Sequence, residues 1–263
     1  MTTQRHPAAP LQTVVVIPAR FASTRLPHKM LLRDTGKPLL QYTYEAAAAA
    51  RRPDAVVVAT DHSEIAAAAL AFGAQVVMTS PDCPSGTDRV AEAARQISDA
   101  RIIVNVQGDE PEISPAAIDR VIELLEENPS AGMATLATPI RHAEQLTNPA
   151  CVKVVCDESG RALYFSRSQI PFIRDAPAAR GLAQFNNPPL FFQHLGLYAY
   201  RRDELLRFAA LPPSSLELAE KLEQLRLLQT GGTIAVDVVE QASSGIDTPA
   251  DYAAFVQRLR KAS

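Results

Sequence analysis

The amino-acid sequence predicts an α/β protein with a doubly wound, mainly parallel sheet. Short runs that are apolar throughout and rich in valine recur along the chain, for example at residues 14–17 and 55–59. Segments with helical patterns and helix-capping residues separate these runs. A strand without polar residues is typical of a sheet that is buried on both faces, which is the position of parallel strands covered by helices.

Strands and helices alternate through the first half of the chain. Ser63 can cap one helix, Gly73 can end it, and Pro115 suits the first turn of another. We expect strands at residues 14–17, 55–60, 75–78, 102–106 and 133–138. We expect helices at residues 38–51, 63–72, 87–97 and 115–127.

The alternation weakens between residues 150 and 200. Strand-like pieces appear there at residues 152–155, 162–165 and 195–200, with a loop at residues 175–189. We interpret residues 150–200 as a small β-rich insertion in a single domain of residues 1–263. The insertion is expected to supply substrate specificity and the surface of a homodimer. Beyond it we expect helices at residues 202–208 and 216–230, a strand at 233–238 and a final helix after Thr248.

Composition excludes several classes of protein. The 263 residues carry a net charge of −3, so no basic field is present to attract nucleic acid. The three cysteines, Cys83, Cys151 and Cys156, form no C-x-x-C pair, which predicts neither a disulfide framework nor a zinc site. No apolar run is long enough to cross a membrane, and residues 1–10 lack the apolar core of a signal peptide. We expect a cytoplasmic protein that binds neither nucleic acid nor membrane.

A basic loop directly follows the first expected strand. Arg20, Arg25 and Lys29 are spaced by small residues and a proline. Ligands of α/β folds bind at such strand ends, and three cations together with backbone N–H groups can neutralise a polyphosphate. Neither of the usual glycine-rich phosphate fingerprints is present, so side-chain charge and loop backbone would have to hold the phosphates. A solvated basic loop explains the same charge spacing equally well.

A carboxylate stands at the end of the fourth expected strand. Gly108 permits a tight turn, and Asp109 follows it. If the first and fourth strands are neighbours, Asp109 lies beside the basic loop, and a carboxylate facing a triphosphate implies a cation such as Mg²⁺ between them. Taken alone, these residues favour a solvated turn before a helix.

Two further segments allow a functional and a simpler interpretation. The loop from Ser85 to Arg89 can hold an anion at the start of a helix, or it can be an ordinary helix cap. Glu223 and Arg226 stand three residues apart in an expected helix, where an exposed ion pair is the simpler interpretation. No arrangement typical of covalent catalysis can be identified from spacing.

An ordered set of motifs nevertheless covers almost the whole chain, from near residue 14 to near residue 252. It comprises residues 17–20, 23–27 with Lys29, 57–61, 85–87, 105–111, 164–167, 194–196, 222–226 and 245–249. Together they resemble the 3-deoxy-manno-octulosonate (Kdo) cytidylyltransferases, also called CMP-Kdo synthetases. The chain departs from that family at His28, where a glycine is common, and at Leu218, where a histidine often stands.

The resemblance implies a nucleotide-diphospho-sugar transferase-like fold and one reaction. CTP and Kdo would give CMP-Kdo and pyrophosphate, and CMP-Kdo is the activated sugar for lipopolysaccharide assembly. The anomeric hydroxyl of Kdo would attack the α-phosphorus in line, without a covalent enzyme intermediate. Catalysis would then consist of positioning and charge neutralisation.

The resemblance also implies roles for individual residues. Arg20 and Lys29 would be catalytic together with the two aspartates Asp109 and Asp247, which would bind Mg²⁺. Nucleotide binding would fall to Arg20, Arg25, Lys29, Ser85 and Arg89. Contacts with Kdo would come from Gln107, Arg167, His194, Tyr198, Glu223 and Gln224.

Two other functions stay open at this point. A cytidylyltransferase for another acidic sugar, such as a sialic acid, would use the same first half, and residues 164–200 should decide between the two; their motifs favour Kdo. A catalytically silent nucleotide-binding protein is the second alternative. The presence of both Asp109 and Asp247 argues against it, because a binding module has no need of two Mg²⁺ carboxylates.

Overall fold

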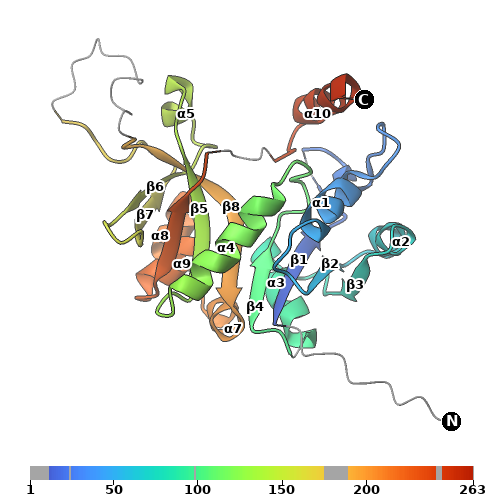
Figure 1. Cartoon of the computed structure of the whole chain (residues 1–263), viewed down its shortest axis with the longest axis horizontal. Helices are drawn as coiled ribbons and strands as arrows, with labels where there is room; N and C mark the ends of the chain where they lie inside the picture. The colour runs from blue at the N-terminus through green and yellow to red at the C-terminus, as the bar shows by residue number, and fades with distance from the viewer. Residues whose placement is uncertain (1–11, 24, 98, 175–188, 241–244, 263) are drawn as a thin grey trace.

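The computed structural model describes residues 12–23, 25–97, 99–174, 189–240 and 245–262. Within these residues nine strands form one sheet, whose main path runs β3-β2-β1-β4-β8-β5-β9, with β6 and β7 beside it (Figure 1). The strands are β1 (Thr13–Ala19), β2 (Ala55–Thr60), β3 (Gln75–Met78), β4 (Ile102–Asn105), β5 (Met133–Pro139), β6 (Lys153–Cys156), β7 (Ala162–Ser166), β8 (Phe192–Arg201) and β9 (Ile234–Val238).

The pairing confirms the predicted mainly parallel sheet. β1 lies between β2 and β4 and pairs in parallel with both, so the first and fourth expected strands are neighbours. β3 continues this parallel half, and β5 pairs in parallel with β9. β8 runs antiparallel between β4 and β5 and joins the two halves. The carboxyl ends of β1 and β4 therefore lie side by side.

Helices cover both faces of the sheet, as the apolar strands require. The described helices are the 3₁₀ helix η1 (Lys29–Leu31) and the α-helices α1 (Leu39–Ala48), α2 (Ser63–Ala71), α3 (Gly86–Gln96), α4 (Pro115–Glu127), α5 (Ala143–Thr147), α7 (Arg202–Ala210), α8 (Ser215–Glu220), α9 (Gln224–Gln229) and α10 (Pro249–Ala262). Val15 and Ile17 of β1 pack with α1, α2 and α4. Val14 and Val16 pack with α3, α7 and α9 on the other face.

The predicted helix over residues 216–230 is wrong, because the structure has two helices there. Lys221 ends α8 in the left-handed conformation, with φ of 54° and ψ of 47°, and α9 starts at Gln224.

The N-terminal caps of two helices also differ from expectation. His62, not Ser63, caps α2, and Ser85, not Thr87, caps α3.

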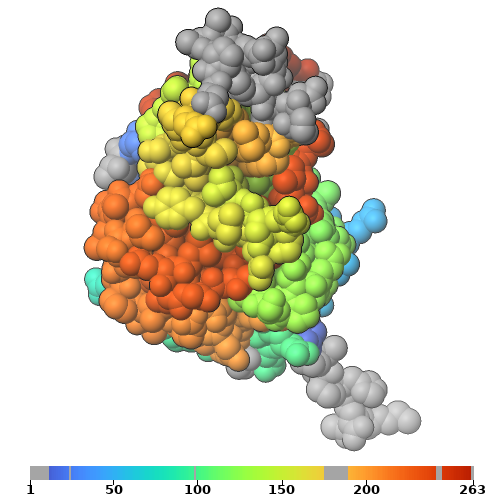
Figure 2. Space-filling model, turned by 90° about the vertical axis from the view of Figure 1, so that its left-hand side faces the viewer, coloured from blue at the N-terminus to red at the C-terminus, as the bar shows by residue number. Residues whose placement is uncertain are grey.

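The expected insertion at residues 150–200 is smaller than predicted. Its last strand, β8, lies inside the main sheet between β4 and β5, and only the first residues of β8 pair with β6. The hairpin of β6 and β7 therefore extends the main sheet at one corner. Figure 2 shows the face that this hairpin, in yellow, forms above α8 and α9, in orange. Most of the predicted loop at residues 175–189 lies outside the described residues.

Across the described residues, none of the helices has the length and apolar character that a membrane crossing requires.

Candidate active site

Three loops meet at the carboxyl ends of β1 and β4. The turn after β4 contacts the loop before α10, since the Ile246 N–H donates to the Asp109 carbonyl at 2.8 Å. Thr43 of α1 donates to the Gly108 carbonyl at 3.0 Å, which anchors the turn to α1. A Cβ at Gly108 would lie 2.9 Å from the Pro18 carbonyl oxygen, so glycine is required where this turn approaches the end of β1.

The ammonium group of Lys29 joins the two predicted metal-binding aspartates. Its Nζ lies 2.5 Å from Asp109 Oδ2 and 3.1 Å from Asp247 Oδ1, and it also donates to the Ile246 carbonyl at 3.0 Å. Arg25 contacts the other oxygen of Asp247 at 3.0 Å. The structure thus brings together the basic loop and both aspartates, which are far apart in the sequence.

A cavity of about 310 Å³ opens beside this cluster. The sequence-predicted residues that line it are Arg20, Lys29, Ser85, Arg89, Gln107, Asp109, Glu223 and Asp247. Ser23, Met30 and Cys83 also line it and received no role from sequence reasoning. Ser23 stands inside the motif of residues 23–27, so a signal for it was present, whereas nothing in the sequence places Cys83 at the site. The cavity is thus lined by cations and carboxylates from five separate segments.

Arg89 stabilises the walls of the cavity. The side chain is buried, and its guanidinium donates to Asp61 at 3.0 Å, Thr79 at 2.5 Å and the Ser80 carbonyl at 3.3 Å. These partners follow β2 and β3, so Arg89 ties α3 to the ends of both strands. Asp61, which sequence analysis left without a role, is the partner that keeps this guanidinium paired.

Ser85 and Glu223 close the side of the cavity formed by α3 and α9. The Ser85 hydroxyl lies 2.7 Å from Asp88 Oδ2 and 3.3 Å from Glu223 Oε2. Burial raises the pKa of Glu223, and hydrogen bonds from Thr87 and Ser85 oppose the rise. Glu223 therefore holds its proton at higher pH than an exposed glutamate does.

The expected exposed pair of Glu223 and Arg226 is wrong. Arg226 is buried and pairs through both ends of its guanidinium with Glu217 of α8, at 2.7 and 2.5 Å. Its remaining donor reaches the carbonyls of Phe208 and Leu211. The left-handed turn between α8 and α9 creates this partner, because in one continuous helix residues nine apart would not meet.

Four predicted sugar-binding residues, all within the described chain, lie outside the lining of this cavity: Arg167, His194, Tyr198 and Gln224. The Arg167 guanidinium donates to the carbonyls of Glu220 at 2.6 Å, Pro149 at 2.8 Å and Lys221 at 3.2 Å. Gln224 is buried, and its amide nitrogen has no partner among the described residues.

A bulge in β8 carries the region of His194 and Tyr198 toward the cavity. Leu136 pairs with Leu195, but the preceding Thr135 pairs with Tyr198, so β8 contains extra residues at this point. A Cβ at Gly196, within the bulge, would lie 3.9 Å from Gln107 Cγ. The bulge therefore lies against a residue that lines the cavity.

His194 is expected to make stability depend on pH. It is buried, with Nε2 3.0 Å from Thr135 Oγ1, and burial lowers its pKa to about 3. The unfolded chain takes up a proton below about pH 6.5 and the folded protein does not, so the free energy of unfolding falls by about 1.4 kcal/mol per pH unit as pH decreases below 6.5.

Urea unfolding at pH 7.0 and 5.5 measures this effect. Between the two pH values, the free energy of unfolding should fall less in the His194→Gln variant than in the wild type. The difference should equal the contribution of the one proton that the unfolded wild type takes up at His194. Equal losses in both proteins would show that His194 is protonated in the folded state as well.

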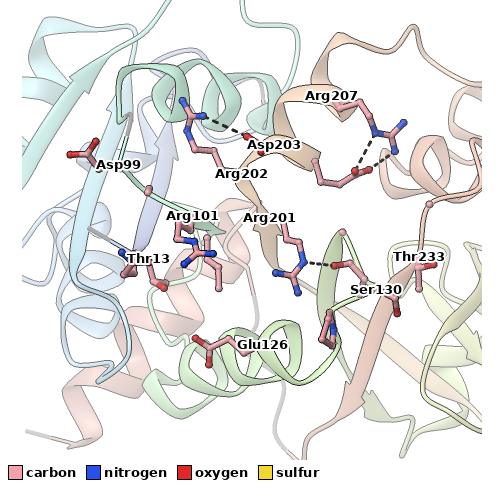
Figure 3. A pocket seen from close by; sticks show the side chains of 18 of the residues that line it. Thr13, Asp99, Arg101, Glu126, Ser130, Arg201, Arg202, Asp203, Arg207 and Thr233 are labelled. Atoms are coloured by element: carbon pink, nitrogen blue, oxygen red, sulfur yellow. Dashed lines mark hydrogen bonds and ion pairs between the residues drawn. The ribbon is translucent and has the colours of Figure 1, made fainter. Parts of the chain in front are cut away.

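A larger cavity of about 860 Å³ lies at the opposite edge of the sheet, where β1, β4, β5 and β9 begin (Figure 3). Several arginines line it, but Arg201 donates to the carbonyls of Ala131 and Leu125, and Arg207 pairs with Glu204. None of the predicted catalytic residues lines this cavity. Ligands of open α/β sheets bind at carboxyl ends, so the smaller cavity is the candidate active site.

The acidic side of the site fits a magnesium ion. Asp109 and Asp247 both reach one cation, the Lys29 ammonium, so their oxygens can also meet at one metal ion. Within the described residues no cluster offers three or more histidine, cysteine or carboxylate groups. Two carboxylates completed by phosphate oxygens and water are what Mg²⁺ usually takes, whereas a metal held by protein alone would need more ligands.

Known proteins are similar to this chain in both sequence and fold. A family model described as cytidylyltransferase matches residues 14–234. The 3-deoxy-manno-octulosonate cytidylyltransferase of Geobacter sulfurreducens is 50% identical over 95% of this chain and 100% of its own length. The enzyme of that name from Rhodopirellula baltica is 48% identical over 95% of this chain and 99% of its own.

Solved structures agree with these relatives. A CMP:2-keto-3-deoxy-manno-octonic acid synthetase in complex with CTP matches with a TM-score of 0.87 and 40% identity, over 96% of this chain and all of the other. A cytidylyltransferase from Leptospira borgpetersenii, 18% identical with a TM-score of 0.61 over 95% of this chain and 87% of its own, shares the fold. The chain belongs to the cytidylyltransferase family and, within it, to the 3-deoxy-manno-octulosonate cytidylyltransferases.

Proposed function

We propose that this enzyme transfers CMP from CTP to the anomeric hydroxyl of Kdo and releases pyrophosphate. The observation that carries the proposal is the cluster of Lys29, Asp109 and Asp247 beside a cavity lined by further cations. The product would be the activated Kdo for lipopolysaccharide assembly. Because the reaction consumes CTP, we place it in the cytoplasm, where nucleoside triphosphates are made.

The basic loop suits the triphosphate. Arg20 lines the cavity, and Arg25 and Lys29 stand around Asp247 at its edge. Positive groups here stabilise the charge that grows on the pyrophosphate as the bond to the α-phosphorus breaks. Holding the sugar hydroxyl and the α-phosphate in line supplies the rest of the rate enhancement. The chain therefore needs no nucleophile of its own.

Asp109 and Asp247 would hold Mg²⁺ together with phosphate oxygens. When bound, Mg²⁺ neutralises phosphate charge and makes the attacking hydroxyl more acidic. The backbone contact between Ile246 and Asp109 keeps the two aspartates at one place. The chain thus provides the positions of the ligands before any substrate arrives.

The sugar would lie between the turn after β4 and the bulge of β8. Gln107 and Glu223 line the cavity on that side, and we assign to Kdo the neighbouring His194, Tyr198 and Gln224. Arg167 suits the sugar carboxylate because a guanidinium binds carboxylates through two parallel hydrogen bonds. To bind the sugar carboxylate, Arg167 must give up the hydrogen bonds that its guanidinium donates to backbone carbonyls in this structure.

Pyrophosphate release tests the proposed function. The enzyme with Mg²⁺ and CTP should release pyrophosphate with Kdo, and more slowly or not at all with a sialic acid. CTP should be turned over in clear preference to ATP and GTP. Comparable turnover with a purine triphosphate would contradict the base selectivity. Faster turnover with the sialic acid would show that the sialic acid, and not Kdo, is the substrate.

We also propose a homodimer that forms through the β6–β7 corner. Large apolar side chains are exposed in this part of the chain: Leu163 of β7, Phe172 after it, and Leu216 and Leu218 of α8. Exposed large apolar side chains are common at protein interfaces. Light scattering at micromolar concentration should give twice the chain mass, and the Leu163→Asp/Phe172→Asp double variant should give the monomer mass. A monomeric wild type would contradict the proposal.

A further inference from the structure

The ammonium group of Lys29 is fully engaged by the acidic side of the site. It contacts Asp109, Asp247 and the Ile246 carbonyl, and only 11% of its side chain is exposed. An ammonium has three N–H donors, and here there are three acceptors. Lys29 therefore has no donor left for a phosphate oxygen while these contacts last.

The proposed reaction makes two demands on the same contacts. The triphosphate needs Lys29, and a divalent cation needs the oxygens of Asp109 and Asp247. A metal ion that shared these carboxylates with the ammonium would be repelled by its positive charge, and this repulsion is strong in a partly buried site. The ammonium and the metal ion therefore compete for the two carboxylates.

We propose that Lys29 is an exchangeable counter-ion, an inference that rests on the proposed function. Before substrate binds, its ammonium bridges Asp109 and Asp247 and keeps these like charges together. When the nucleotide arrives with its divalent cation, the ammonium passes from the carboxylates to the triphosphate oxygens. Lys29, Asp109 and Asp247 each keep an oppositely charged partner before and after this exchange.

The surrounding backbone lets the carboxylates stay in place during the exchange. The Ile246 N–H holds the Asp109 carbonyl, and the Asp251 carboxylate accepts from the N–H groups of Asp247 and Thr248 at 3.1 and 2.8 Å. Only the flexible side chain of Lys29 has to move.

Positive coupling between metal and nucleotide follows. A metal ion alone must displace an ammonium that has nowhere else to bind, whereas the triphosphate offers the ammonium a new partner. Each ligand should therefore raise the affinity for the other, and by the same factor.

Binding of Mn²⁺ to the nucleotide-free protein, measured by electron paramagnetic resonance, tests the competition. The Lys29→Met variant should bind Mn²⁺ at least about 20-fold more tightly than the wild type, within the usual range of such couplings. Arg25→Met is the matched control, since it removes the same charge from an exposed partner of Asp247 alone. It should change the affinity by less than about fivefold.

Two outcomes would overturn the inference. Equal Mn²⁺ affinity in the wild type and Lys29→Met would show that the ammonium does not compete with the metal. An equal gain in Arg25→Met and Lys29→Met would show that overall charge, and not the bridging contact, controls the affinity. A wild type that binds no CTP would instead refute the proposed function, so the two failures are distinguishable.

The wild-type protein offers a second readout that depends on no variant's folding. Lys153 is also buried and donates to the carbonyls of Asn148, Cys151 and Arg167, away from the cavity lining. Both ammonium groups should give slowly exchanging signals in ¹H–¹⁵N spectra. Mg²⁺ with CTP should shift the Lys29 signal and leave that of Lys153 in place. An unmoved Lys29 signal with CTP bound would overturn the exchange.

Discussion

Replacing either Asp109 or Asp247 with asparagine is expected to slow CMP transfer by at least about 100-fold. Each change removes one of the two carboxylates that we assign to Mg²⁺. CTP should still bind in part, because Arg20 and Lys29 of the basic loop remain. Single-turnover rates at saturating Mg²⁺, together with CTP affinities, measure the two effects separately.

The double variant shows whether the aspartates act as one unit. Both contact the same ammonium, at 2.5 and 3.1 Å. The double change should therefore be little worse than either single change, because the first removes most of what the pair provides. Multiplicative losses would mean that Asp109 and Asp247 act at separate places, and a near wild-type rate in a single variant would remove that residue from the site.

Replacing Glu217 with alanine is expected to lower the free energy of unfolding by about 3–5 kcal/mol, because it leaves the buried Arg226 without its partner. Both side chains are over nine-tenths buried, and two short hydrogen bonds join them. Thermal and urea unfolding measure the loss.

The exposed pair of Lys37 and Glu45 provides the matched control. Both side chains are more than two-fifths exposed, so Glu45→Ala should cost no more than about 1 kcal/mol. Glu217→Ala should also lower activity in the folded protein, because Arg226 anchors the helix that starts beside Glu223. A Glu217→Ala protein as stable as the control variant would show that Arg226 is solvated or finds another acceptor.

The sequence predicted the main sheet well because its signals are local. Four β-branched residues in a row indicate a strand buried on both faces, and residues 14–17 of β1 pack against helices on both sides. The neighbouring position of β1 and β4, on which the link between Asp109 and the basic loop depends, is confirmed by their pairing.

What the sequence did not predict depends on contacts between distant segments. Lys221 is an ordinary helix former, yet it adopts the left-handed conformation at the break across which Arg226 pairs with Glu217. β8 was assigned to an insertion because its strand pattern does not reveal its neighbours. The bridge from Lys29 to two aspartates likewise requires the loop before α10 to fold back over the first strands.

Oxygen labelling tests the central claim most directly. In the proposed reaction the anomeric hydroxyl of Kdo attacks the α-phosphorus of CTP. Kdo labelled with ¹⁸O at that hydroxyl should give CMP-Kdo that keeps the label in its bridging oxygen, as seen by mass spectrometry and by the isotope shift of its ³¹P signal, and pyrophosphate without label. Failure to form CMP-Kdo, or loss of the label from it, would contradict the account.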